Sequence, residues 1–319
     1  MQKHKTSIVA RALAAATALI ACISMAACGS DDSAQPNSAI PGVSAKQIAG
    51  VTASGKPGEK PTISFKTPLT VENNAYVILE EGNGAQIKAG NRLCLQGLVI
   101  NTKDGTELNS TWASGQLDCS VALNDTYRQS NPDRYEIFTH MKVNGTVAFG
   151  SNDGTGAASY LFVYTIVDQM KDLTKAEGTK VKDIPADLPT VTTAEDGKPS
   201  IDMHGYKGSD KLISQTIIEG TGPETKEGDY AVVKYTGWLL NGKQFDSSWD
   251  KNTTFDAPLF TSSTGGVIKG WEKGLQNHKV GSQVLLVVPP DMGYGDKENG
   301  SIPANSTLVF VVDILGKYK

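Results

Sequence analysis

Aromatic side chains surround a single acid in the segment YTGWLLNGKQFDSSW, from Tyr235 to Trp249. The acid, Asp246, directly follows Phe245, and the pair comes shortly after an Asn-Gly dipeptide that is typical of tight turns. The segment has no histidine, no cysteine and no basic cluster, so it lacks the base–nucleophile pairs and metal-ligand sets of most hydrolytic sites. The segment thus offers several aromatic side chains and one acid, and the chemistry that such a set could serve has to come from the rest of the sequence.

Strands and one short helix are predicted around this segment. The runs rich in β-branched and aromatic residues, typical of strands, are YAVVKYTGW (230–238), SQVLLVV (282–288) and STLVFVVDIL (306–315). Between strands, GWEKGLQNH places Trp271 and Leu275 four residues apart, on one face of a short helix. Antiparallel strands with a single helix indicate an α+β domain in which the helix packs on the sheet.

An earlier part of the chain repeats this pattern with changes. Matching segments keep their order and are offset by 137 or 138 positions; they are EEGNG and IEGTG, PTISF and PSIDM, and DGTELNSTW and NGKQFDSSW. Ordered matches of this kind predict two copies of one domain, at 61–170 and 199–319. The stretch 171–198, which contains KDIPADLPTVTTAEDGKP, is predicted to be an extended linker between them.

The segments VVKYTGWLLNGKQFDSSW, VIKGWEKGL, PPDMGYG and IPANSTLVFVVDIL follow one another between about residue 215 and the C-terminal residue. In order and spacing they resemble the FKBP family of peptidyl-prolyl isomerases. The resemblance implies that each copy is a curved antiparallel β-sheet wrapped around one short α-helix, with a proline-binding cup between helix and sheet. The implied catalytic positions are Tyr235, Phe245, Asp246, Ile268, Trp271, Tyr294 and Phe310, and the implied further substrate contacts are Phe255, Val267 and Ile302.

The reaction implied by this resemblance is rotation about the amide bond that precedes proline, which needs no metal and no cofactor. By resemblance, the Ile268 backbone N–H and the Tyr294 hydroxyl bind substrate carbonyls, while Asp246 orients the site. The expected partners are proline-containing unfolded or secreted polypeptides, and macrolides that mimic the prolyl group are expected inhibitors. Ser301 and Met292, where the family often has larger residues, affect the rim of the cup and hence its preferences.

Other interpretations of the same residues remain open. Trp271 and Phe310 are also ordinary core residues by pattern, and Asp246 is also an ordinary turn residue. The alternative function is a non-catalytic peptide-binding lipoprotein that uses the fold as a scaffold. A formal net charge of −4 disfavours nucleic-acid binding, and the four scattered histidines have no metal-ligand spacing.

Residues 1–27 predict a lipoprotein signal peptide. Lys3, Lys5 and Arg11 precede a short apolar run, and Met25-Ala26-Ala27-Cys28 resembles a bacterial lipobox, in which Cys28 is lipidated. The alternative is an ordinary signal with an incidental cysteine. The polar stretch 28–60 is then predicted to be a flexible tether, and the protein is expected on the extracytoplasmic face of a bacterial cell membrane.

The first copy lacks most of the implied cup. Leu108-Asn109 replaces Phe245-Asp246, and no tryptophan occurs in the region that aligns with the helix, so the copy is interpreted as degenerate. It also contains Cys94 and Cys119, 25 residues apart. Outside the cytoplasm such a pair favours a disulfide, although two buried free thiols are the alternative.

Overall fold

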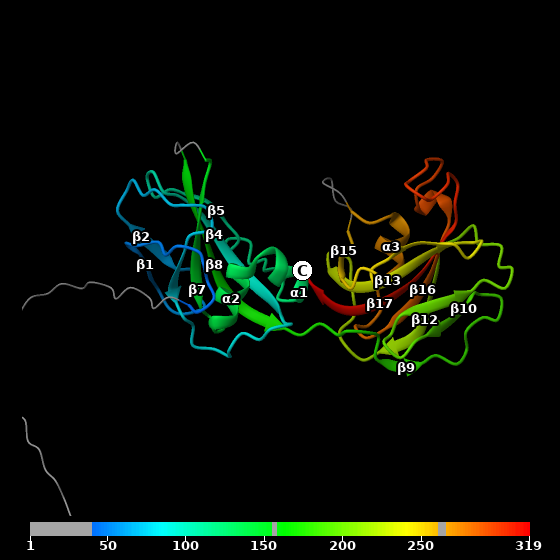
Figure 1. Cartoon of the computed structure of the whole chain (residues 1–319). Helices are drawn as coiled ribbons and strands as arrows, with labels where there is room; N and C mark the ends of the chain where they lie inside the picture. The colour runs from blue at the N-terminus through cyan, green and yellow to red at the C-terminus, as the bar shows by residue number, and fades with distance from the viewer. Residues whose placement is uncertain (1–39, 155–157, 261–265) are drawn as a thin grey trace, which may run out of the picture. The chain divides into compact units, whose positions relative to one another are not determined.

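A computed structural model describes residues 40–154, 158–260 and 266–319 (Figure 1). Strands form most of the regular secondary structure of the described residues, and they are arranged in two antiparallel sheets and two hairpins. Among the described residues no helix has both the length and the hydrophobicity needed to cross a membrane. The predicted α+β class with antiparallel sheets is confirmed.

The first sheet has six strands in the order β3-β7-β8-β4-β5, with β6 pairing with β4. Their bounds are β3 (Tyr76–Glu80), β4 (Arg92–Asn101), β5 (Glu107–Ser110), β6 (Asp118–Ala122), β7 (Thr146–Asn152) and β8 (Ser159–Met170). Helices α1 (Asp125–Ser130) and α2 (Pro132–His140) lie between β6 and β7 in the chain, and the hairpin β1 (Val51–Ser54) and β2 (Thr62–Phe65) comes first.

The second sheet has seven strands in the order β14-β13-β17-β16-β12-β9, with β15 pairing with β13. Their bounds are β9 (Gly178–Lys180), β12 (Ile213–Gly220), β13 (Tyr230–Leu239), β14 (Gln244–Ser247), β15 (Phe255–Pro258), β16 (Gln283–Val288) and β17 (Leu308–Tyr318). The other elements here are the hairpin β10 (Thr190–Thr193) and β11 (Pro199–Asp202), the helix α3 (Lys269–Gly274) and the 3₁₀ helix η1 (Pro290–Met292).

The two sheets share their strand order. Neighbouring strands of the first sheet are β3, β7, β8, β4 and β5; those of the second sheet are, in the matching direction, β12, β16, β17, β13 and β14, with β9 added beside β12. The additional strand β6 pairs with β4, and β15 pairs with β13 in the same way. Even the irregularities coincide, because the β4–β8 register shifts after Cys94 and the β13–β17 register shifts after Val232. The offset of 138 positions between the sequence repeats aligns Cys94 with Val232.

The central strands of the second sheet are buried on both faces, which explains their unbroken apolar sequences. All six residues of β16 are buried. Since neighbouring side chains of a strand point to opposite faces, Leu286 packs in the cluster with α3, whereas Leu285 packs with Leu188 and Met203 beside the β10–β11 hairpin. The sheet is thus covered by α3 on one face and by the hairpin on the other.

The expected linker at 171–198 is in part folded structure, so that prediction is wrong for these stretches. Gly178–Lys180 pairs with β12, and Thr190–Thr193 pairs with β11. The predicted tether at 28–60 is likewise wrong where Val51–Ser54 pairs with β2 and Ile48 is buried. The strands β1, β9 and β10 are only three or four residues long and contain few apolar residues, so their local sequences give little strand signal.

The first sheet carries two helices rather than the one that was expected. Asn131 has φ −139° and ψ 60°, which ends α1, and Pro132 starts α2. Proline disfavours the helical conformation in the residue before it and is well tolerated at the first position of a helix. The Asn-Pro pair therefore divides one helical segment in two.

We predict that a fragment of residues 172–319 is more stable than one of residues 199–319. The shorter fragment loses buried Leu188 and the hydrogen bond that the Ala176 N–H donates to Asp313. One buried leucine and one such bond together stabilise by about 3 kcal/mol. The shorter fragment should therefore melt about 10 °C lower by circular dichroism. Equal melting temperatures would show that β9 and β10 contribute nothing to this sheet.

Candidate functional site

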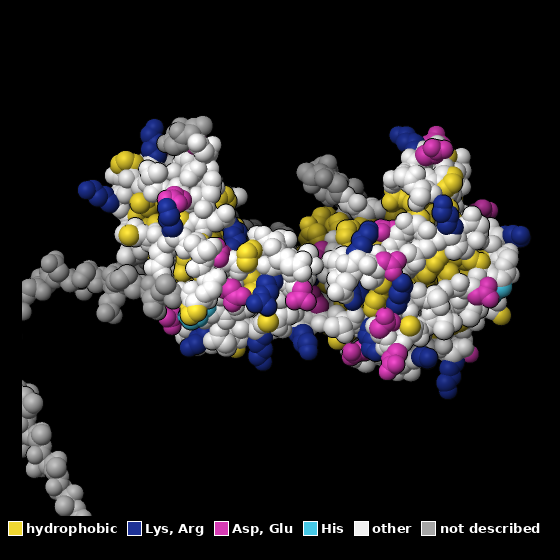
Figure 2. Space-filling model, in the orientation of Figure 1, with side chains coloured by type: hydrophobic (Ala, Val, Ile, Leu, Met, Phe, Trp, Pro, Cys, Tyr) yellow, Lys and Arg dark blue, Asp and Glu magenta, His cyan; other side chains and the backbone are white. Residues whose placement is uncertain are grey.

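A cavity of about 270 Å³ opens between α3 and the concave face of the second sheet. Its residues come from β13, β14, β15, β17, the start of α3 and the loop after η1; they are Tyr235, Phe245, Asp246, Phe255, Gly266, Val267, Ile268, Trp271, Tyr294 and Phe310. Figure 2 shows hydrophobic side chains gathered at the surface near β15 and α3. On the same face, acidic and basic side chains are interspersed.

Trp271 lies at the centre of the aromatic walls. Its ring is 5.0 Å from that of Tyr235 and 5.3 Å from that of Phe310, both edge to face. Phe245 meets Phe310 at 5.5 Å and 90°. Edge-to-face pairs are favoured because the positive ring edge meets the negative ring face. Trp271 and Phe310 are each only 4% exposed, so they form the floor, whereas Phe255 at 41% forms an open wall.

Gly237 on β13 gives the aromatic rings room to approach the sheet. A Cβ atom at this position would lie 2.6 Å from the Phe245 ring and 2.9 Å from the Phe310 ring. Gly270 plays a similar part in α3, because a Cβ atom there would lie 2.4 Å from Val288 of β16. These two glycines let the helix and the rings come close enough to form a continuous floor.

Asp246 is fully occupied by hydrogen bonds from its neighbours. Its Oδ2 accepts a bond from the Tyr235 hydroxyl, and its Oδ1 accepts bonds from Lys251 Nζ at 2.6 Å and from the Ser247 N–H at 2.9 Å. Partial desolvation raises the pKa of Asp246, but the bonds from Lys251 and Tyr235 outweigh it and lower the pKa below its usual value. Asp246 is therefore an ionised acceptor that fixes Tyr235.

The two tyrosines of the cavity keep their protons at neutral pH. Burial, followed by the hydrogen bond to Asp246, raises the pKa of Tyr235 above its ordinary value. Burial and then the negative charge of Asp246 raise the pKa of Tyr294. Tyr294 is 39% exposed at the rim, so its hydroxyl can act as a donor to a bound peptide.

Nine of the ten residues expected in the site line this cavity. The exception is Ile302, which is 6% exposed and packs in the apolar cluster that supports the cavity floor. Ile268 is the N-cap residue of α3, which places its backbone N–H at the cavity end of that helix. Sequence reasoning missed Gly266 and Lys251; the charge of Lys251, five residues after Asp246, was the available signal.

The first sheet presents different side chains at the matching places. Asn109 pairs with Val99 as Asp246 pairs with Gly237. The third residue of α2 is Arg134, whereas the third residue of α3 is Trp271. The Arg134 guanidinium lies 4.5 Å from the centre of the Phe149 ring, so this helix position carries a cation where α3 carries an aromatic ring.

The remaining predicted positions are cysteines. Cys94 and Cys119 are joined by a disulfide between β4 and β6, and both are buried. Cys28 lies outside the described residues. Within the described ranges, no group of three or more His, Cys, Asp or Glu residues is placed to hold a metal ion.

Comparisons with known proteins agree with this geometry. The family model described as FKBP-type peptidyl-prolyl cis-trans isomerase matches residues 222–315. The chain is 42% identical over 109 residues to FK506-binding protein 1 of Aspergillus oryzae, covering 31% of this chain and 91% of the relative. It is 43% identical over 110 residues to the FK506-binding protein of Neisseria meningitidis, covering 34% and 97%.

A longer relative matches over the same part of the chain. FkpA of Escherichia coli is 41% identical over 104 residues, which cover 33% of this chain and 37% of FkpA. The crystal structure of FkpA aligns with a TM-score of 0.31 and 36% identity, covering 40% of this chain and 51% of that chain.

We predict a flat pH profile for any reaction in this cavity. The pKa of Asp246 is lowered and those of Tyr235 and Tyr294 are raised, so none of the three changes charge between about pH 5.5 and about pH 9. A rate constant kcat/KM measured on a proline tetrapeptide should vary by less than about twofold over this range. Because the pKa of Asp246 is lowered on folding, its stabilising bonds are lost only as the pH falls below about 4. A bell-shaped profile centred near neutrality would instead indicate acid–base catalysis.

Proposed function

Because the chain belongs to the FKBP-type peptidyl-prolyl cis-trans isomerase family, we propose that the cavity around Trp271 rotates X–Pro bonds in polypeptides that fold outside the cytoplasm. The observation that carries the assignment to this site is the apolar aromatic floor of the cavity. Trp271 and Phe310 are almost fully buried, yet both border a cavity that opens to solvent. A plain core would fill this space with side chains, whereas a binding site leaves it open.

The aromatic walls suit the chemistry of amide rotation. The planar amide has partial double-bond character and a barrier of about 18–20 kcal/mol. Twisting the bond removes this resonance and with it much of the charge separation of the carbonyl group. A less polar transition state is favoured over the planar amide in an apolar cavity, and such differential binding accelerates the reaction. A thousandfold gain requires only about 4 kcal/mol.

Polar groups at the rim would hold the peptide while its bond rotates. We assign the binding of substrate carbonyls to the Ile268 N–H and the Tyr294 hydroxyl, because Ile268 caps α3 beside the cavity and Tyr294 lines its rim. Asp246 acts through Tyr235, whose ring it fixes against Trp271. Lys251 balances the charge of Asp246 at the surface, where its side chain is 63% exposed.

The first sheet supports a non-catalytic role for the other part of the chain. Its strand order and register match those of the isomerase sheet, which supports a duplicated domain. Arg134 and Leu108 stand where Trp271 and Phe245 form the cavity. We infer a degenerate domain that has kept the fold and lost the proline-binding cup.

A lipid anchor on Cys28 remains part of the proposal. The apolar run before Cys28 supports a signal peptide, and the Cys94–Cys119 disulfide supports an oxidising compartment. Residues 1–39 lie outside the described structure, so the anchor is supported by sequence alone.

The isomerase proposal predicts a sharp contrast between two matched substitutions. Phe245→Ala removes a cavity wall and should lower kcat/KM on a proline tetrapeptide about tenfold or more. Leu108→Ala, at the matching place in the first sheet, should leave kcat/KM unchanged. Both variants should be compared at equal folded concentration, and Tyr294→Phe should cause a smaller loss than Phe245→Ala.

Equal losses from Phe245→Ala and Leu108→Ala would contradict the assignment of activity to the second sheet. Activity absent from the native chain, with a peptide still bound, would favour the non-catalytic alternative.

The anchor predicts a change in membrane partitioning. Cys28→Ser should block lipidation, so the variant should move from the detergent phase to the aqueous phase in a detergent-partitioning assay on expressing bacteria. Lys269→Ser, far from the N-terminus, serves as a control that should partition like the native protein. Unchanged detergent partitioning of Cys28→Ser would refute the anchor.

A further inference from the structure

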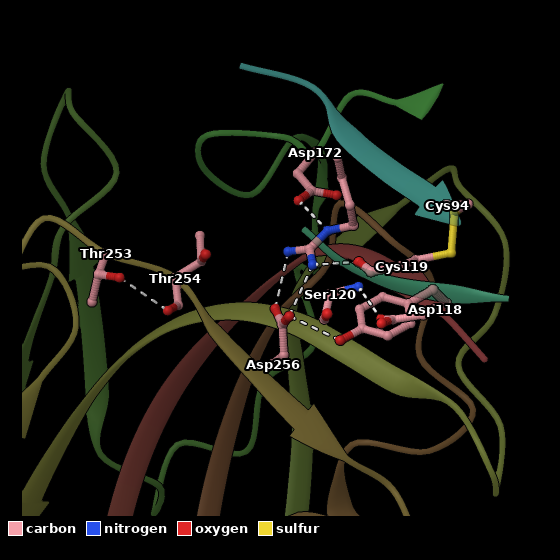
Figure 3. Close-up of polar contacts among 10 residues, drawn as sticks. Cys94, Asp118, Cys119, Ser120, Asp172, Thr253, Thr254 and Asp256 are labelled. Atoms are coloured by element: carbon pink, nitrogen blue, oxygen red, sulfur yellow. Dashed lines mark hydrogen bonds and ion pairs between the residues drawn. A yellow bond between two sulfur atoms is a disulfide. The ribbon is translucent and has the colours of Figure 1, made fainter. Parts of the chain in front are cut away.

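Arg92, at the start of β4 in the first sheet, is a buried cation with an unusually complete set of partners. Its side chain is 1% exposed. Its Nε donates to Asp172 Oδ2 at 2.8 Å, and its Nη1 donates to the Cys119 carbonyl oxygen at 2.9 Å. Asp256 receives two further bonds, from Nη1 at 2.8 Å and from Nη2 at 3.0 Å. Figure 3 shows Asp172, Asp256 and Cys119 converging on this guanidinium.

Each partner restricts the orientation of the Arg92 guanidinium. The Tyr318 ring, near the end of β17, lies 5.1 Å below it, and the Tyr318 hydroxyl donates to Asp256 Oδ2 at 2.9 Å. The Cys94–Cys119 disulfide fixes the strand that supplies the carbonyl acceptor. Two-point contacts between arginine and a carboxylate define direction as well as distance. A buried arginine costs desolvation, so its value here lies in the geometry that it imposes.

Asp256 connects this cluster to the isomerase cavity. It directly follows Phe255 on β15, a strand of four residues that pairs only with β13 in the described structure. Since consecutive strand residues point to opposite faces, Asp256 turns toward Arg92 while Phe255 turns toward the cavity. The Phe255 ring lies 6.0 Å from Trp271 and 6.2 Å from Tyr235, and it is the most exposed aromatic wall.

We propose that Arg92 of the first sheet is a positioning residue for the isomerase site, because it fixes Asp256 and through it the Phe255 wall. The proposal rests on the isomerase activity assigned to the cavity above. The first sheet then has a function although it lacks a proline-binding cavity. The proposal also identifies the short edge strand β15 as the element through which the first sheet acts on substrate binding.

A double-mutant cycle separates positioning from general loss of stability. Arg92→Met should lower kcat/KM on a proline tetrapeptide roughly tenfold, mainly through a higher KM, because a displaced wall weakens substrate positioning. Phe255→Ala alone should cause a similar loss. Arg92→Met added to Phe255→Ala should then change kcat/KM by less than about twofold, since the wall that Arg92 positions is already missing. Arg128→Met is the matched control, because Arg128 of α1 also pairs with an acid and an aromatic ring, both of α2, but lies at the surface.

A second measurement detects the environment of the Phe255 ring directly and does not depend on catalytic activity. The chain has eight phenylalanines, so ¹⁹F spectra of fluorophenylalanine-labelled protein can be assigned by single substitutions. Asp256→Asn and Arg92→Lys, which keep the side-chain size or the charge, should shift the Phe255 signal and leave the Phe162 signal of the first sheet in place. These milder variants also serve if Arg92→Met fails to fold.

The outcomes are decisive in both directions. The proposal is supported by a shifted Phe255 signal together with non-additive losses in the cycle. An unmoved Phe255 signal overturns it, as does a folded Arg92→Met protein with native kcat/KM. An equal loss in the native and Phe255→Ala backgrounds also overturns it. Absence of activity in the native chain would refute the isomerase assignment instead, and the ¹⁹F spectra would still test whether Arg92 positions Phe255.

Discussion

The edge-to-face packing of Trp271 against Tyr235 and Phe310 is the contact on which the rest of the site depends. It places three rings from a helix and two strands around one apolar cavity. Because rotation about an amide bond proceeds through a less polar state, this apolar surface is the feature to which the proposed function assigns catalysis. In the proposed mechanism the polar groups position the rings, and Asp246 does so by accepting a hydrogen bond from the Tyr235 hydroxyl.

The scaffold keeps that packing fixed by covering the sheet on both faces. Every residue of β16 is buried, between α3 on one side and the β10–β11 hairpin on the other. A sheet packed in this way resists deformation, because interiors at native density transmit small displacements to their neighbours. The open side of the cavity is different, since Phe255 stands on a short edge strand. The contact between Arg92 and Asp256 adds a restraint to this strand beyond the packing of Ala257 in the core.

Much of the fold and of the cavity could be predicted from the sequence, because runs such as that of β13 show their strand type locally and the aromatic positions occur in ordered motifs. The strands β9 and β10 could not, since β9 has no apolar side chain and forms only by pairing with β12, and Val191 is the single apolar residue of β10. The burial of Arg92 could not be predicted either, because a charged residue is expected at the surface. Only the folded chain brings Asp172 and Asp256 to it. The division of α1 from α2, by contrast, was readable from Asn131-Pro132 and was overlooked.

The central claim is that X–Pro bonds rotate against Trp271, and the indole N–H signals of the chain's four tryptophans test it most directly. A proline tetrapeptide is added to ¹⁵N-labelled protein, and exchange between its cis and trans forms is followed in the same sample. The account predicts that the Trp271 signal shifts as exchange cross-peaks appear, while the signal of Trp112 in the first part of the chain stays in place. Catalysed exchange with an unmoved Trp271 signal, or with Trp112 shifting in its stead, would contradict the account.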